Sequence, residues 1–310
     1  TGSTEVATLL QRNIASRLDA QGRPIPLIAE TGGMNAMIVD SSALTEQVVV
    51  DVLASAFDSA GQRCSALRVL CLQDEIADHT LKMLRGAMAE CRMGNPGRLT
   101  TDIGPVIDSE AKANIERHIQ TMRSKGRPVF QAVRENSEDA REWQSGTFVA
   151  PTLIELDDFA ELQKEVFGPV LHVVRYNRNQ LPELIEQINA SGYGLTLGVH
   201  TRIDETIAQV TGSAHVGNLY VNRNMVGAVV GVQPFGGEGL SGTGPKAGGP
   251  LYLYRLLANR PESALAVTLA RQDAKYPVDA QLKAALTQPL NALREWAANR
   301  PELQALCTQY

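Results

Sequence analysis

Apolar residues recur along the chain at two spacings, which predict helices and strands in alternation. Near the start, Ser3 or Thr4 can cap a helix and Glu5 suits its positive end. The apolar residues of that helix, at helical spacing, are Val6, Leu9, Leu10 and Ile14. Short apolar runs at 25–30 and 36–39 are bounded by glycine or proline, a pattern typical of buried strands.

The remainder of the first 221 residues continues this alternation. Further helices are predicted at 45–60, 75–91, 109–125, 181–190 and 204–212. Strands are predicted at 67–72, 151–156, 170–176, 195–200 and 217–221, and the polar stretch 128–146 indicates a surface loop. Such alternation favours an α/β fold with a mainly parallel sheet that is covered on both faces.

The last ninety residues differ in composition from the rest. The stretch 227–250 is rich in glycine and low in charge, and after Leu257 alanine, leucine, glutamine and charged residues dominate. One or two amphipathic helices are predicted at 280–306, interrupted at Pro289 and Pro301. We place a module boundary near Asn259.

Composition and charge exclude several classes of function. The chain has 310 residues, is 44% hydrophobic and carries a net charge of -5, without a basic cluster that would indicate nucleic acid binding. Its apolar stretches are too short or too interrupted to span a bilayer. The four cysteines form no CxxC pair and no ligand cluster with the histidines, so we expect no metal, and free thiols in a reducing cytoplasm. There is no initiator Met, so we expect the N-terminus to be a cut edge.

Two compact motifs carry the candidate chemistry. Cys64 lies in the loop-like run 61–66 (GQRCSA), and Glu30 opens the run 30–36 (ETGGMNA). A neutral thiol is a poor nucleophile and needs a base, which Glu30 can supply directly or through a water. The backbone N–H of Cys64 can stabilise an oxyanion. This pairing suits acyl chemistry through a thioester, and leaves a protease, a transferase and a dehydrogenase open.

Five motifs in order resemble the aldehyde dehydrogenase superfamily. They are the helix start 1–7, the glutamate motif 30–36, the cysteine motif 61–64, the run 165–169 (EVFGP) and the run 234–237 (PFGG). The resemblance covers about residues 1 to 257. It implies a three-layer, Rossmann-like α/β catalytic domain with a partial dinucleotide-binding domain and a helical C-terminal tail.

The resemblance implies a role for each motif. Cys64 attacks an aldehyde, hydride leaves to a nicotinamide cofactor, and Glu30 activates the water that hydrolyses the thioacyl intermediate. The expected cofactor is NAD, with NADP left open. Its candidate ligands are Gly2 and Ser3 for the pyrophosphate, Glu165 for the ribose and Phe167 beside the nicotinamide.

Within the superfamily the chain most resembles the glutamate-semialdehyde (pyrroline-5-carboxylate) dehydrogenase domain of bifunctional proline-utilization enzymes. The residues that carry this likeness are the runs 63–66, 227–231 and 242–250. The expected substrate is an amino-acid semialdehyde, bound by Arg63, Ser65, Gly227, Ala228 and Phe235. A different semialdehyde or an aliphatic aldehyde remains an alternative, as does a non-enzymatic binding or oligomerisation piece.

The family's first half has no counterpart here, so the chain is expected to be a C-terminal fragment that is inactive alone. We expect 1–31 to end a dinucleotide-binding domain and 32–240 to form the catalytic domain. Residues 241–258 would return to the cofactor side, and 259–310 would begin an extra helical domain. The parent is expected to be a cytoplasmic homodimer, with peripheral association with the inner membrane as an alternative placement. FAD is expected only in an upstream proline dehydrogenase domain. No nucleic acid partner through this segment and no transmembrane segment are expected.

Overall fold

The computed structural model describes residues 1–133, 146–257, 291–292 and 295, in two compact units, Thr1–Arg255 and Leu256–Tyr310. Apart from Leu256, the structural features below belong to the first unit. Most of the predicted helices at 280–306 and most of the predicted loop at 128–146 lie outside the described residues.

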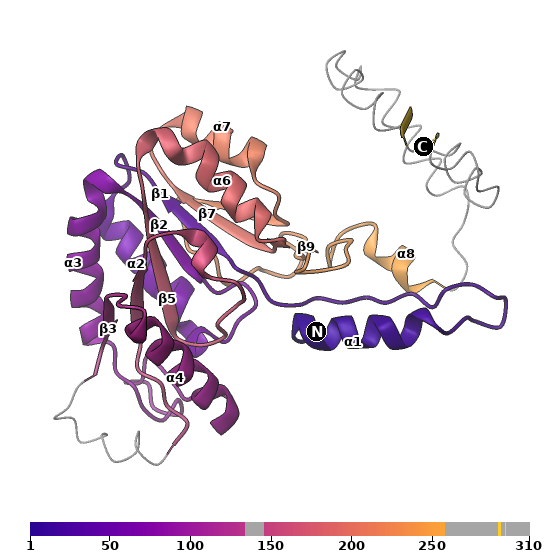
Figure 1. Cartoon of the computed structure of the whole chain (residues 1–310), viewed down its shortest axis with the longest axis horizontal. Coiled ribbons are helices and arrows are strands. Elements are labelled where there is room, and N and C mark those ends of the chain that lie inside the picture. The colour runs from indigo at the N-terminus through magenta and orange to yellow at the C-terminus, as the bar shows by residue number, and fades with distance from the viewer. Residues whose placement is uncertain (134–145, 258–290, 293–294, 296–310) are drawn as a thin grey trace. The chain divides into compact units, whose positions relative to one another are not determined.

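Among the described residues, seven strands form one sheet in the order β3-β4-β5-β2-β1-β7-β8 (Figure 1). They are β1 (Ala36–Val39), β2 (Val69–Gln73), β3 (Val129–Gln131), β4 (Thr152–Leu156), β5 (Val170–Tyr176), β7 (Thr196–His200) and β8 (Asn218–Val221). All neighbours run parallel except β3, which is antiparallel to β4. A separate ribbon joins β6 (Tyr193–Gly194) to β9 (Glu238–Gly239). The predicted mainly parallel α/β fold is confirmed.

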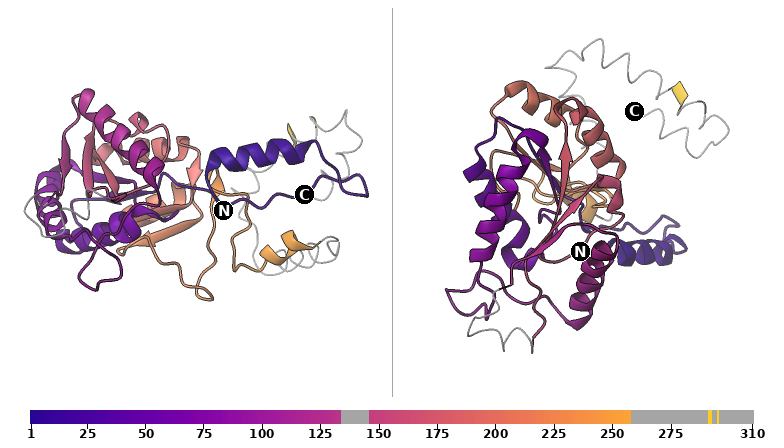
Figure 2. Two further views of the ribbon diagram at one scale, coloured as in Figure 1. Left: turned by 90° about the horizontal axis from the view of Figure 1, so that it is seen from below. Right: turned by 60° about the vertical axis from the view of Figure 1, so that its left-hand side comes forward.

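Helices cover both faces of this sheet. The helices α2 (Thr45–Phe57) and α3 (Asp74–Glu90) pack together on one face, and α6 (Leu181–Ala190) and α7 (Asp204–Ser213) lie on the other (Figures 1 and 2). The remaining helices are α1 (Thr4–Ala15), α4 (Ser109–Ser124) and α8 (Tyr252–Leu256). Single turns of 3₁₀ helix occupy Asp58–Gly61, Phe159–Glu161 and Arg178–Gln180. Because parallel strands are buried on both faces, the central residues of β1, β2 and β7 do not alternate between apolar and polar side chains.

The predicted cap of the first helix is confirmed. The Ser3 side chain accepts a hydrogen bond from the Val6 N–H at 3.2 Å, as expected of a residue just before a helix. No residue of α1 is buried within the described structure, and the apolar side chains on it are exposed, Leu9 by 58%.

The predicted strand at 25–30 is wrong. This segment forms a single isolated bridge, in which Glu30 lies opposite Gly242, and Ile25 is 38% exposed. An apolar run becomes a strand only where a neighbouring strand supplies a ladder of hydrogen bonds, and no such ladder forms here.

The predicted helix at 45–60 ends three residues early, at Phe57. Ser59 (φ 56°) and Ala60 (φ 53°) then adopt the left-handed conformation, followed by Gly61 (φ 66°). Left-handed backbone is unfavourable for residues with a β-carbon, so this turn stores strain immediately before the cysteine motif.

Candidate active site

Cys64 occupies a tight turn between α2 and β2. The Ala66 N–H donates to the Arg63 carbonyl at 3.0 Å, which places Cys64 and Ser65 at the two central positions of the turn. The thiol is half-buried. Burial raises its pKa, the N–H groups of Ser65 and of Cys64 itself oppose that shift, and the negative charges of Glu165 and Glu30 add to it. The resting sulfur is therefore a thiol that needs a base.

Arg68 is a residue of this site that the sequence reasoning missed. Its side chain is fully buried, and Nε and Nη2 donate to Glu165 Oε1 at 3.1 and 2.9 Å. Nη1 donates to the Gly61 carbonyl at 2.7 Å, and the guanidinium lies 5.1 Å from the centre of the Phe167 ring. A single arginine in a strand-like run gave no signal of burial; only its partner, 97 residues away, explains it.

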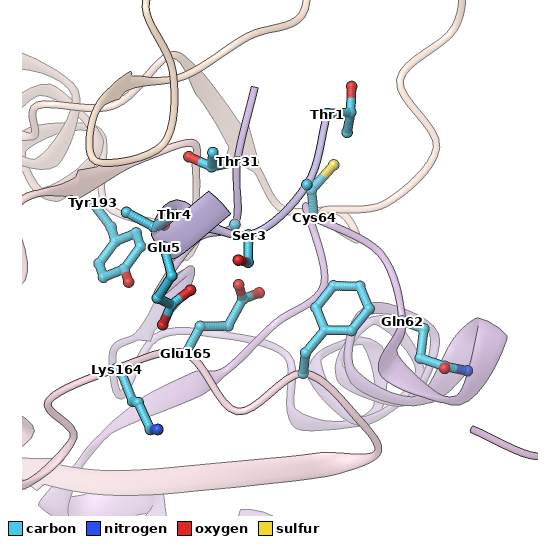
Figure 3. A pocket seen from close by; sticks show the side chains of 13 residues that line it. Thr1, Ser3, Thr4, Glu5, Thr31, Gln62, Cys64, Lys164, Glu165 and Tyr193 are labelled. Atoms are coloured by element: carbon cyan, nitrogen blue, oxygen red, sulfur yellow. The ribbon is translucent and has the colours of Figure 1, made fainter. Parts of the chain in front are cut away.

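One cavity brings several of the predicted residues together. It has a volume of about 500 Å³ and is bordered by Gly2, Ser3, Cys64, Glu165 and Phe167, whose surroundings Figure 3 shows. Residues from the start of α1, the cysteine turn and the 165–169 run therefore share one space. Further lining residues are Thr1, Thr4, Glu5, Thr31, Gly32, Gln62, Lys164 and Tyr193.

Glu165 is held tightly in this cavity wall. Burial raises its pKa, while the charge and hydrogen bonds of Arg68 and the N–H of Gly33 lower it. A β-carbon on Gly32 would lie 1.6 Å from Glu165 Oε2, so the carboxylate lies directly against a backbone that only glycine allows.

Glu30 lies beside the cavity rather than in its wall. Its Oε2 accepts from the Gly237 N–H at 3.3 Å, and its Oε1 has no hydrogen-bond partner in the described part of the chain. Burial raises the pKa of this carboxyl group, and the Gly237 N–H opposes the shift. A partly buried carboxylate whose Oε1 has no partner among the described residues can accept a proton from a water, although no direct hydrogen bond joins it to Cys64 in the described structure.

The start of α1 is partly occupied by the chain's own groups. The Gly2 N–H donates to the Glu30 carbonyl at 3.2 Å, and the Ser3 hydroxyl is shared between the Val6 N–H and the Glu5 carboxyl group. The helix N-terminus faces the cavity, where N–H groups and the helix dipole favour anions.

The five predicted substrate residues do not border this cavity. Arg63 is exposed and donates to the Ser59 hydroxyl at 3.0 Å, whereas Ser65 is buried in the cysteine turn. Gly227 (φ 77°) and Ala228 lie in a loop after β8. Phe235 pairs with Ala247 through two backbone hydrogen bonds of 2.9 Å.

Comparison with known proteins decides the family. The model of the aldehyde dehydrogenase family matches residues 1–258. The chain belongs to this family. It is 90% identical over its whole length to the bifunctional protein PutA of Salmonella typhimurium, of which it covers 24%. The aldehyde dehydrogenase chain therefore spans about a quarter of that relative's length.

Two solved structures of other members share this fold. A crystal structure of bifunctional proline utilization A is 52% identical, with a TM-score of 0.76, over 82% of this aldehyde dehydrogenase chain and 25% of the other. A 1-pyrroline-5-carboxylate dehydrogenase from Thermus, with bound NAD, is 35% identical, with a TM-score of 0.73, over 82% and 48% of the two chains. No helix in the described ranges is long and apolar enough to cross a bilayer.

Proposed function

We propose that this chain carries the aldehyde-oxidising centre of a PutA-type enzyme, which converts L-glutamate γ-semialdehyde, formed from pyrroline-5-carboxylate, to L-glutamate in the second step of proline catabolism. The observation that supports this most is the shared cavity of Cys64 and Glu165, in a chain 90% identical to a bifunctional PutA. An aldehyde-oxidising centre fits these features better than a binding or oligomerisation piece, because the Cys64 thiol, the Glu165 carboxylate and a helix N-terminus line one cavity, with Glu30 beside it.

The cavity fits one end of NAD. The start of α1, at Gly2 and Ser3, suits the pyrophosphate, and Glu165 suits ribose hydroxyl groups as a hydrogen-bond acceptor. Phe167 would lie beside the nicotinamide. A β-carbon on Gly2 would meet no atom within 4 Å, so there is room at the helix start. When bound, NAD supplies the hydride acceptor for the oxidation. Use of NAD is further supported by the Thermus relative, which was solved with it.

The chain's own residues act before and after that oxidation. Cys64 Sγ bonds to the aldehyde carbon, and the thiol proton leaves to a base or to water. The N–H groups of the cysteine turn stabilise the oxygen that becomes negative. After the substrate carbon has become a thioester, Glu30 takes a proton from the water that attacks it. Cleavage of the C–S bond releases the carboxylic acid and the Cys64 thiolate.

The substrate carboxylate and amine are assigned to Arg63, Ser65, Gly227 and Ala228, with Phe235 as an apolar wall. Arg63 and Ser65 are supported by their place directly on either side of Cys64, and Gly227 and Ala228 by the resemblance of the run 227–231 to the family. A hydroxyl group and backbone N–H groups are suitable donors for a carboxylate. We also propose domain limits at 31, 240 and 258, a cytoplasmic homodimer, and FAD in an upstream domain of the intact polypeptide. Analytical ultracentrifugation of the intact polypeptide tests the dimer.

Substitution of the nucleophile tests the proposed function. In the intact PutA-type polypeptide that contains these residues, Cys64→Ala is expected to abolish NAD-dependent oxidation of glutamate semialdehyde, while Cys91→Ala, at the end of α3, leaves it within twofold. Proline oxidation by the same protein serves as an internal check of folding. Aldehyde oxidation that survives Cys64→Ala refutes the assignment.

The isolated residues 1–310 are expected to show no turnover with NAD and glutamate semialdehyde. Measurable turnover would contradict the expectation that the cofactor site needs further segments.

A further inference from the structure

The carbonyl groups of the turn around Cys64 (residues 61–66, the nucleophile turn) are bound by two buried side chains. Asn35 Nδ2 donates to the carbonyl oxygens of Cys64 at 2.7 Å and of Ala66 at 2.8 Å. Arg68 donates to the carbonyl oxygens of Gly61 at 2.7 Å and of Arg63 at 3.1 Å. Two side chains therefore bind four carbonyl groups within six residues of backbone.

Both side chains are themselves fixed. Asn35 is 2% exposed, and its Oδ1 accepts from the Thr196 N–H at the start of β7, at 3.1 Å. A β-carbon on Gly33 would lie 2.4 Å from that Oδ1, so the neighbouring glycine makes room for the amide. The Arg68 fork is fixed by Glu165. Neither side chain can reorient without breaking several buried hydrogen bonds.

Because a peptide group is planar, a side chain that holds its carbonyl group also fixes the direction of its N–H group. In a trans peptide the C=O of one residue and the N–H of the next point in opposite directions. Asn35 binds the Cys64 carbonyl, which fixes the direction of the Ser65 N–H. Arg68 binds the Arg63 carbonyl, which fixes the direction of the Cys64 N–H. These two N–H groups are the ones that interact favourably with a negative Cys64 sulfur.

We propose that Asn35 and Arg68 are positioning residues, which bind the carbonyl oxygens of Cys64 and Arg63 and thereby aim two backbone N–H groups at the nucleophile. The consequence for chemistry rests on the proposed function: the same N–H groups face the oxygen of an aldehyde that the sulfur attacks. The effect on the thiol itself does not depend on which aldehyde is used.

Alkylation of the thiol tests the proposal without substrate or NAD. The rate of Cys64 modification by iodoacetamide is measured from pH 6 to 10 in the intact polypeptide. Trypsin releases Cys64 in the peptide 64–68, separate from the other three cysteines of this chain, so mass spectrometry follows it individually. Because only the thiolate reacts, the pH profile reports how well the turn stabilises negative sulfur.

Asn35→Ala is expected to shift this profile about one pH unit upward and to slow alkylation about tenfold at pH 7.5. This is the effect of losing one charge-assisted hydrogen bond, that from the Ser65 N–H to the Cys64 thiolate. Asn35→Ser, whose hydroxyl can reach only one carbonyl, is expected to fall between the alanine variant and the wild type. The matched control is Asn189→Ala on α6, where the amide also bridges two segments, through Ser213 and His215. It should leave the profile unchanged.

A folded Asn35→Ala or Asn35→Ser variant with the wild-type profile overturns the proposal, and so does an equal shift in Asn189→Ala. If the alanine variant fails to fold, the serine variant decides. Loss of the proposed function has a different signature: aldehyde oxidation that survives Cys64→Ala, with the alkylation shifts still present.

Discussion

Removal of the Arg68 guanidinium is the sharpest test of how the site is stabilised. In Arg68→Met the side chain keeps much of its length, but the buried Glu165 carboxylate loses its only ion-pair partner among the described residues. The carbonyl of Gly61 also loses its 2.7 Å donor. The Glu165 side chain is 14% exposed, so solvent screens the pair little. Breaking such a buried pair from one side destabilises a protein by about 3–5 kcal/mol.

The loss should depend on pH in a defined direction. Burial raises the pKa of Glu165 and Arg68 opposes that, so the variant raises the pKa further. A carboxyl group whose pKa is higher in the folded than in the unfolded protein binds protons more tightly when folded. Its folded state is favoured at low pH, and that stability is lost as the pH rises through the folded pKa. The deficit of Arg68→Met should therefore be smaller at pH 5 than at pH 8.

Urea unfolding at the two pH values measures both effects. The control is Arg85→Met, whose partly exposed ion pair with Glu155 should contribute less than about 1 kcal/mol. A deficit below about 1 kcal/mol for Arg68→Met, or one that does not shrink at pH 5, would show that Glu165 does not depend on Arg68 for its charge.

Three further predictions concern the cavity and its chemistry. Gly32→Ala should displace the Glu165 carboxylate and weaken NAD binding, measured by fluorescence titration, at least tenfold. The control is Gly86→Ala, in open space on α3, which should raise the free energy of unfolding by about 0.5–1 kcal/mol. Equal NAD affinity in the two variants contradicts the geometry. Ser65→Ala should raise KM for glutamate semialdehyde more than for propionaldehyde in steady-state assays; an equal rise rejects the carboxylate contact. Because the pKa of Glu30 is raised, the deacylation rate in rapid-quench experiments should fall on acidification at a higher pH than for an ordinary carboxyl group. Glu30→Gln should remove this acidic fall from the pH profile. An unchanged fall in Glu30→Gln excludes Glu30 as the base.

Most helices and strands could be predicted from the sequence because each shows in the local spacing of its apolar residues. The limits of β5 and α6 agree with the predicted 170–176 and 181–190 to the residue. The failure at 25–30 has a physical reason, since strand formation depends on a partner, and local hydrophobicity carries no information about whether one is present.

The candidate site was predicted only as far as its motifs reach. Cys64 and Glu165 meet in one cavity, as motif order suggested. The roles of Arg68 and Asn35 could not be read from the sequence, because each depends on partners far away in the chain. Asn35 was part of the glutamate motif, but nothing local distinguishes an amide that binds two carbonyl groups from one that faces water.

The contact between Asn35 and Thr196 has a consequence for the newly made protein. The two residues are 161 positions apart, so the nucleophile turn is completed only after β7 has been synthesised. Thr196 follows Cys64 by 132 positions, so at roughly 5–20 residues per second about 7 to 26 seconds separate their synthesis. During this interval, Cys64 belongs to an unfinished chain with an ordinary thiol. We therefore expect the cysteine to be open to oxidation and disulfide exchange until Asn35 has bound the carbonyl groups of its turn.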